Sequence, residues 1–148
     1  MSVAERRLPL NVRFFPFREL TAQWPAPGSV ISVPAYILFR HKGVVSDRWH
    51  HGKPMVISNS ARAGGIAEEP WDVFTSGQPW TDEGHTGNLP PWEVLQRARS
   101  ARRTQYNLLE WNCENFVAYC HGLPPNSPQL AAVALLTLAG VVLAAARS

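Results

Sequence analysis

Short apolar runs separated by turn-forming residues fill the first half of the chain and predict β-strands. Residues 29–39 (SVISVPAYILF) are rich in β-branched and aromatic residues and are split by Pro34. Residues 41–47 (HKGVVSD) and 53–60 (KPMVISNS) predict two further strands, joined by the turn-like RWHHG. Residues 66–74 (IAEEPWDVF) predict a fourth strand that runs into a short helix.

The spacing of apolar residues becomes helical after a predicted loop at residues 76–91. Residues 91–103 (PWEVLQRARSARR) place apolar side chains opposite basic ones, which predicts an amphipathic helix that a proline can start. A second helix is predicted from near Asn112 to near Gly122, a favourable C-terminal cap residue. One face of this helix carries small and apolar side chains: Cys113, Phe116, Val117 and Cys120.

The last apolar run, residues 130–146, contains 17 uncharged residues after a proline-rich linker at residues 124–129. As a helix it would be about 25 Å long, near the lower limit for a bilayer core of about 30 Å. Because the run is apolar on all faces, we expect a membrane anchor. The alternative is a buried core helix or an oligomerising helix, since a short apolar run does not distinguish them.

Composition indicates one globular domain with many loops. The chain has 148 residues, of which 45% are hydrophobic and 17% charged, and it has 13 prolines. The proline-punctuated residues 1–26 are expected to wrap around this domain. A formal net charge of +3 is mild, so the sequence gives no indication of a nucleic-acid partner.

The two cysteines, Cys113 and Cys120, are seven residues apart in one predicted helix. Their axial separation is roughly 10 Å, beyond the Cα distance of about 7 Å that a disulfide tolerates. The N-terminal residues lack the uninterrupted apolar core of a signal peptide. We therefore expect free thiols in a reducing, cytoplasmic setting.

Cys113 is a candidate nucleophile because it is predicted to begin a helix. The unpaired amides and the dipole at a helix N-terminus favour a thiolate over a thiol, and a nearby histidine lowers a cysteine pKa further. Asn112 is a good N-cap type, which supports this position of the helix start. The alternative is that Cys113 is an ordinary small core residue.

A nucleophilic cysteine needs a base, and His41 is the best candidate. It lies at a predicted strand end, where a sheet would hold the imidazole in place. The other histidines are expected to be ordinary polar residues: His50, His51, His85 and His121. A zinc site built from Cys120, His121, His50 and His51 has no recognised ligand spacing, so neither a metal nor another cofactor is expected.

Three segments together resemble the lecithin:retinol acyltransferase-like proteins, the circularly permuted branch of the papain-like cysteine hydrolases. They are residues 27–45 (PGSVISVPAYILFRHKGVV), 55–69 (MVISNSARAGGIAEE) and 98–120 (ARSARRTQYNLLEWNCENFVAYC). The HKGVV block is weakly specific, whereas the NCENF block is strongly specific. The resemblance covers most of a domain at residues 27–123.

This resemblance implies an α+β fold in which a small antiparallel sheet packs on helices. The sheet would carry His41 and a third polar residue, and one helix would begin at Cys113. His41 would deprotonate Cys113, whose sulfur would attack an ester or amide carbonyl to give a thioester. The backbone amide of Cys113 is then a natural oxyanion donor.

The chain departs from the family pattern at Ser58, where members usually have a second histidine. Ser58 or the neighbouring Asn59 is expected to orient His41, but a serine cannot stabilise an imidazolium by charge. Activity is therefore expected to be weakened or lost. At Asn115 many members have histidine, which we regard as peripheral, and Glu114 is expected to favour the helix start.

The expected function is acyl transfer from, or hydrolysis of, a lipid ester in the manner of a phospholipase A or acyltransferase. The catalytic domain would be cytoplasmic and associated with a membrane through residues 130–146. Two alternatives stay open at this point. One is an amidase or peptidase, and the other is a non-catalytic member of the fold that binds lipid or protein.

Overall fold

A five-stranded antiparallel sheet forms the centre of the protein in a computed structural model, which describes residues 23–36, 39–101, 112–125 and 128–146. Its strand order is β4-β3-β2-β1-β5. The strands are β1 (Val30–Tyr36), β2 (Phe39–His50), β3 (Lys53–Ser60), β4 (Gly65–Pro70) and β5 (Thr81–Gly84). The helices are α2 (Trp71–Thr75), α3 (Pro91–Ser100), α4 (Cys113–Cys120) and α5 (Pro128–Ala145).

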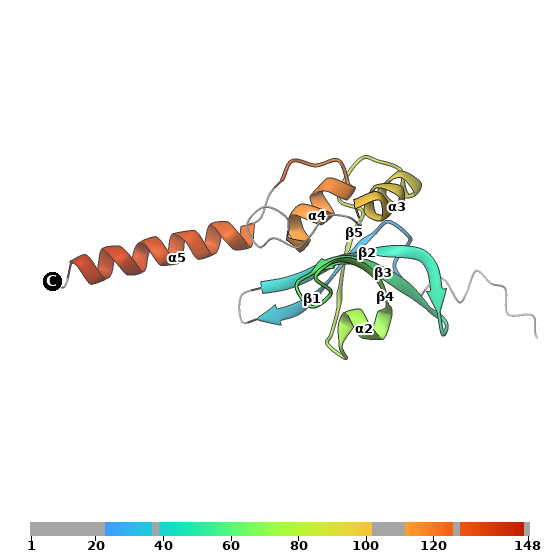
Figure 1. The fold of residues 1–148 in the computed structure, drawn as a ribbon, viewed down its shortest axis with the longest axis horizontal. Helices are drawn as coiled ribbons and strands as arrows, with labels where there is room; N and C mark the ends of the chain where they lie inside the picture. The colour runs from blue at the N-terminus through green and yellow to red at the C-terminus, as the bar shows by residue number, and fades with distance from the viewer. Residues whose placement is uncertain (1–22, 37–38, 102–111, 126–127, 147–148) are drawn as a thin grey trace, which may run out of the picture.

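Helices cover both faces of the sheet (Figure 1): α3 and α4 lie on one side and α2 lies on the other. Side chains alternate along each strand, so neighbouring residues enter different cores. Val44 and Ile57 pack with α3 and α4, whereas Val45 and Val56 pack with α2. The two faces of β2 and β3 therefore belong to two separate apolar clusters.

The hairpin between β2 and β3 turns through two residues, His51 and Gly52. Both have positive φ angles, 48° and 75°, as a type I′ hairpin turn requires. Histidine is among the non-glycine residues that most often adopt this conformation. The turn predicted in RWHHG is confirmed, and it sets the pairing of His50 with Lys53.

The predicted α+β class, with a small antiparallel sheet packed on helices, is confirmed. So are the strand at 53–60 and the strand that runs into a short helix near Trp71. The prediction that residues 76–91 form only a loop is wrong, because they contain β5. The sequence of β5, TDEG, has no apolar residue, and the strand forms through its pairing with β1.

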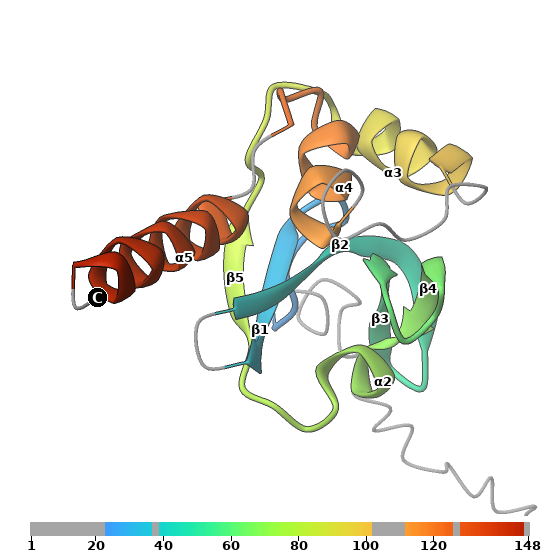
Figure 2. The same ribbon diagram turned by 60° about the vertical axis from the view of Figure 1, so that its left-hand side comes forward.

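The helix α5 has 18 residues and extends away from the sheet (Figures 1 and 2). Large apolar side chains are exposed along it: Leu135, Leu136, Leu138, Val141, Val142 and Leu143. Within the described residues, no helix combines the length and hydropathy needed to cross a membrane. The expected transmembrane anchor is thus not supported, and an 18-residue helix rises only about 27 Å.

Most of the predicted wrapping segment, residues 1–22, lies outside the described residues. The described end of this segment does pack on the domain. The Trp24 ring lies 5.0 Å from that of Trp71, edge to face, and Trp24 contacts the apolar cluster beneath α2. An aromatic contact therefore joins this part of the segment to α2.

Candidate active site

Asn112 determines where α4 begins. Its backbone is extended, with φ −96° and ψ −178°, and its side-chain oxygen accepts hydrogen bonds from the amides of Glu114 and Asn115 at 3.0 Å each. These bonds satisfy two of the amides that a helix start leaves unpaired. The helix therefore begins at Cys113, as the sequence predicted, and places the thiol in its first turn.

The thiol of Cys113 packs against the backbone of β2. It donates to the carbonyl oxygen of Arg40, with the sulfur 3.8 Å from that oxygen. Burial raises the pKa of the Cys113 thiol, and the charge of Glu114 adds to this effect, while the Lys42 amide and charge oppose it. The thiol is therefore protonated at neutral pH and needs a base to become a nucleophile.

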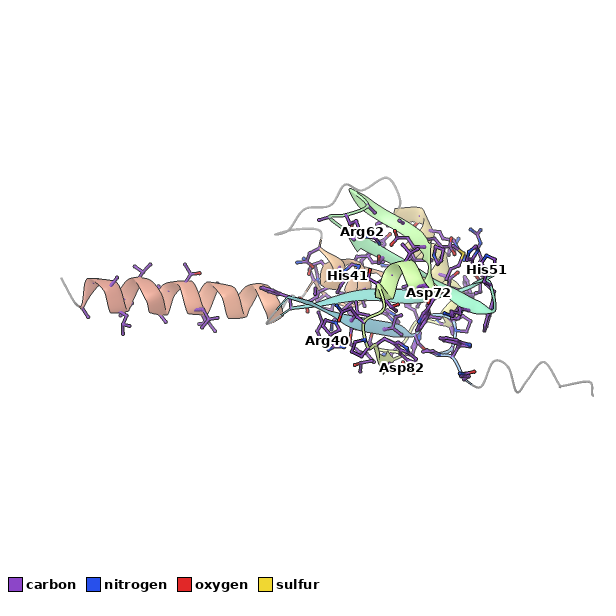
Figure 3. The ribbon with its side chains drawn as sticks, turned by 90° about the horizontal axis from the view of Figure 1, so that it is seen from below. Arg40, His41, His51, Arg62, Asp72 and Asp82 are labelled. Carbon is purple, nitrogen blue, oxygen red and sulfur yellow. The ribbon has the colours of Figure 1, made fainter. Side chains whose placement is uncertain are left out.

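The imidazole of His41 packs against Phe74 of α2, with the ring centroids 5.0 Å apart. Figure 3 shows the labelled His41 beside this helix. Burial, together with the charge of Arg62, lowers the pKa of His41 to about 4. The ring is thus neutral at neutral pH, which is the form that can accept a proton.

Gly43 lies two residues after His41 in β2, and its lack of a side chain leaves room for the contact between His41 and Phe74. A Cβ atom at Gly43 would lie 2.5 Å from Cγ1 of Val56 and 2.9 Å from the Phe74 ring. The glycine of the HKGVV block therefore allows Phe74 to approach the strand beside His41. Gly43 also shows that this side of β2 faces α2.

Cys113 and His41 therefore reach β2 from its two faces, the thiol with α4 and the imidazole with α2. Within the described residues, the imidazole makes a ring contact but no hydrogen bond, and the thiol bonds to the Arg40 carbonyl. The structure brings Cys113 next to the backbone that carries His41. Their pairing as nucleophile and base stays a prediction.

Ser58 and Asn59 are both buried, with 1% and 0% of their surface exposed, but they face different sides of β3. Ser58 shares the face of Val56, which is also the face of His41, whereas Asn59 shares the face of Ile57 and α4. Within the described residues, the Ser58 hydroxyl has no hydrogen-bond partner. Of the two candidates for orienting His41, Ser58 therefore lies on the face of the resting imidazole, and Asn59 lies on the face of the thiol.

Two basic side chains that the sequence reasoning did not select lie on the same face of β2 as α4. The Arg40 guanidinium donates to the Ser32 hydroxyl at 2.9 Å and to that of Thr81 at 2.8 Å. The Lys42 ammonium pairs with Glu83 at 3.0 Å. Alternation along β2 could have placed both residues on one face, but their partners Thr81 and Glu83 lie on β5, which was predicted as a loop.

A pocket of about 390 Å³ lies beside the first turn of α4. This volume is within the range of about 300–1,000 Å³ that small-molecule sites occupy. Its walls combine the Lys42–Glu83 ion pair with apolar residues. The lining residues are Lys42, Glu83, Thr86, Glu114, Val117, Ala118, Leu123 and Pro124.

The residues considered for a zinc site do not gather in the structure. His50 and His51 contact each other at the exposed β2–β3 hairpin, whereas Cys120 and His121 are buried at the end of α4. Within the described part of the chain, no group of three or more histidine, cysteine or carboxylate side chains could hold a metal ion.

Comparison with protein families identifies a related family. The family model described as Lecithin retinol acyltransferase matches residues 25–122. The matched range contains the whole sheet, α2, α3 and α4, and it includes Cys113, His41 and Ser58. No curated protein matches the chain.

Proposed function

The chain belongs to the lecithin retinol acyltransferase family, and we propose that it acts on lipid esters through a covalent thioester on Cys113. Membership of this family indicates an acyltransferase or related lipid function. The observation that carries the finer proposal is the position of Cys113. Its residue begins α4 in the NCENF block, and its thiol packs on β2 against the carbonyl of Arg40, which precedes His41 in the chain.

His41 is proposed as the base. Its neutral imidazole takes the thiol proton, and the sulfur attacks the ester carbonyl carbon. The tetrahedral intermediate collapses with cleavage of the ester C–O bond, and the imidazolium returns the proton to the departing alkoxide. Water or an acceptor alcohol or amine then attacks the thioester, His41 takes its proton, and the C–S bond breaks to restore the thiol.

The reaction requires the His41 imidazole to leave Phe74 and reach the other face of β2, so the backbone near the start of β2 has to move as well as the side chain. The ring contact that it would lose is worth about 0.5–1.5 kcal/mol, which is small beside a typical catalytic barrier. His41 lies near the start of β2 and is only partly buried. Catalytic hydrogen bonds are often loose before substrate binds, so we propose that substrate binding favours a conformation of β2 in which His41 faces the thiol.

The amide of Cys113 is proposed to stabilise the oxyanion. The Asn112 side chain accepts from the amides of Glu114 and Asn115, and the Cys113 amide is the first of the helix. A backbone donor at the start of a helix adds both a hydrogen bond and the helix dipole. The negative charge that develops on the carbonyl oxygen would therefore lie at a favourable position.

We also propose that the enzyme works at a membrane surface, with its catalytic domain on the cytoplasmic side. The support is the row of exposed leucine and valine side chains on α5, which water solvates poorly. Contact of α5 with lipid would keep the site near its substrate and raise the local substrate concentration. Lipid esters are the substrates that such a position would favour.

Intact-protein mass spectrometry with a p-nitrophenyl fatty ester tests the thioester. The natural protein should gain the mass of one acyl group, hydroxylamine should remove that mass, and Cys113→Ala should not gain it. Cys113→Ser serves as a matched control for size. Equal acylation of the natural and Cys113→Ala proteins would show that Cys113 is not the nucleophile.

The resting separation of Cys113 from His41 favours a second candidate, a non-catalytic member of the family that binds lipid. In that case the natural protein would bind a fluorescent acyl lipid without becoming acylated. Binding that is unchanged in Cys113→Ala, together with no added mass, would support this candidate over the enzyme.

A further inference from the structure

The pocket beside α4 begins next to the proposed nucleophile. Two of its lining residues are immediate neighbours of site atoms: Glu114 follows Cys113 in the chain, and the Lys42 amide interacts with the Cys113 sulfur. A group attached to the sulfur therefore has an adjoining space. The pocket is part of the same face of β2 that the thiol contacts.

The pocket follows one face of α4. Glu114, Val117 and Ala118 stand at positions i, i+3 and i+4, so they share that face. From Glu114 to Ala118 the helix rises about 6 Å, in the direction away from the thiol. Leu123 and Pro124, just after α4, continue the wall beyond Ala118.

The chemistry of the wall changes along this direction. Near the thiol it is charged, but Lys42 and Glu83 pair with each other at 3.0 Å and so contribute no net charge. Farther along, the wall is apolar, with Val117, Ala118 and Leu123. A ligand with a polar end at the thiol and an apolar end beyond it matches this change.

We propose that this pocket receives the acyl chain of the substrate ester, and that Ala118 limits the chain length it accepts. The proposal rests on the proposed function, because the chain would be the one bound to Cys113. A methyl side chain at position 118 leaves the middle of the pocket open. A larger side chain there would close the path toward Leu123.

The first test compares p-nitrophenyl butanoate with p-nitrophenyl decanoate. In the natural protein, kcat/KM should rise with chain length by about fourfold for each methylene that the pocket encloses. In Ala118→Leu, the decanoate-to-butanoate ratio of kcat/KM should fall by about tenfold. Ala118→Val is the smaller variant, to be used if the leucine prevents folding, and it should lower the ratio less.

A matched pair of exposed residues controls for the loss of surface apolar area. Leu123 and Val73 are each 40% exposed, but only Leu123 lines the pocket, since Val73 lies on α2. Leu123→Ser should lower the ratio for the two esters, and Val73→Ser should leave it unchanged. A ratio that is the same in Ala118→Leu and Leu123→Ser as in the natural protein would overturn the proposal.

A binding measurement distinguishes a failure of the pocket proposal from a failure of the proposed function. A fluorescent decanoyl ester should bind to Cys113→Ala, which cannot form a thioester, and its Kd should rise by about tenfold when Ala118→Leu is added. Weaker binding in the double variant would support the pocket even if no turnover were seen. An unchanged Kd would assign the chain to another surface, while acylation of Cys113 would still support the enzyme.

Discussion

The thiol of Cys113 and the imidazole of His41 contact strand β2 from opposite faces. The sulfur lies 3.8 Å from the carbonyl oxygen of Arg40, and the imidazole centroid lies 5.0 Å from that of Phe74. Burial shifts both groups toward their neutral forms, since it raises the pKa of Cys113 and lowers that of His41 to about 4. The resting site therefore holds a neutral thiol and a neutral imidazole.

Replacement of His41 tests its role as the base. His41→Ala should lower the rate of Cys113 acylation by about 100-fold or more, because general-base catalysis typically contributes 10²–10⁴-fold. The rate is followed by p-nitrophenol release under single-turnover conditions. His50→Ala is the matched control, since His50 is exposed at the hairpin and should leave the rate unchanged. Full activity of His41→Ala would remove His41 from the mechanism.

Replacement of Ser58 tests whether its side chain orients His41 or only fills space. Its buried hydroxyl has no hydrogen-bond partner within the described residues, so Ser58→Ala should change the free energy of unfolding by less than about 1 kcal/mol. If Ser58 orients the His41 imidazole on the face that they share, the pH profile of kcat should nevertheless shift.

Ser46→Ala is the control for Ser58→Ala. The Ser46 hydroxyl is also buried, but it donates to Glu68 at 2.6 Å, so its removal should destabilise the protein by about 1–3 kcal/mol. Urea unfolding measures both variants. Loss of stability in Ser58→Ala without any change in the pH profile would indicate that Ser58 only fills space.

The parts of this fold that the sequence predicted depend on local signals. Asn112 caps α4 through amides two and three residues away, and the turn at His51 and Gly52 needs only its own φ angles. By contrast, β5 has no apolar residue and forms by pairing with a strand some fifty residues earlier. Single-sequence patterns carry no information about such a partner.

In the candidate site, too, local sequence signals predicted some features, whereas contacts between distant residues determine others. The nucleophile position follows from the local helix start at Cys113, and His41 was selected from its place at a predicted strand end and then supported by the family resemblance. The contact of His41 with Phe74 joins residues 33 positions apart, and it depends on Gly43 and the placement of α2. Whether Ser58 or Asn59 faces His41 depends on the register of β3, which short apolar runs do not determine.

The environment of His121 leads us to predict that the protein loses stability in mild acid. The residue is 1% exposed, and burial, together with the charge of His85, lowers its pKa from 6.5 to about 4. Because the folded state disfavours the charged imidazole, stability is highest above pH 6.5, where His121 is neutral in both the folded and the unfolded chain. Stability is then lost as pH falls toward 4, because the unfolded chain takes up the proton more readily. The loss amounts to at most about 3 kcal/mol.

Urea unfolding between pH 7 and pH 4 measures this effect, with about one unit between points. His121→Phe keeps a ring of similar size and removes the titration, so its free energy of unfolding should vary less over this range than that of the natural protein. His50→Phe, at the exposed hairpin, should follow the natural protein. Identical pH dependence in His121→Phe and the natural protein would contradict this assignment.

Arg99 joins α3 to the sheet through a partly buried ion-pair cluster. Its guanidinium contacts Glu68 at 3.0 Å and also Asp47, and the Glu68 side chain is only 4% exposed. Arg99→Met should destabilise the protein by about 3 kcal/mol, because it removes a partner of a buried carboxylate.

The ion pair of Arg62 with Glu69 is the control for Arg99→Met, since 58% of the Arg62 side chain is exposed. Exposed pairs contribute little, so Arg62→Met should cost less than about 1 kcal/mol. Thermal unfolding at neutral pH compares the two variants. Similar losses for both would show that Arg99 does not hold α3 on the sheet.

Association with lipid through α5 is the last prediction. Flotation with neutral phosphatidylcholine vesicles should recover the natural protein in the lipid fraction, whereas a chain truncated after Ser127 should stay in the aqueous fraction. Leu138 and Val142 are 62% and 59% exposed and stand four residues apart on one face of the helix. Changing both to aspartate should release the protein, since each aspartate in a lipid environment costs up to about 3 kcal/mol.

Val73→Asp introduces a single negative charge on α2, where we expect no lipid contact, and this variant should float like the natural protein. Flotation of the truncated chain would instead assign the lipid contact to the domain.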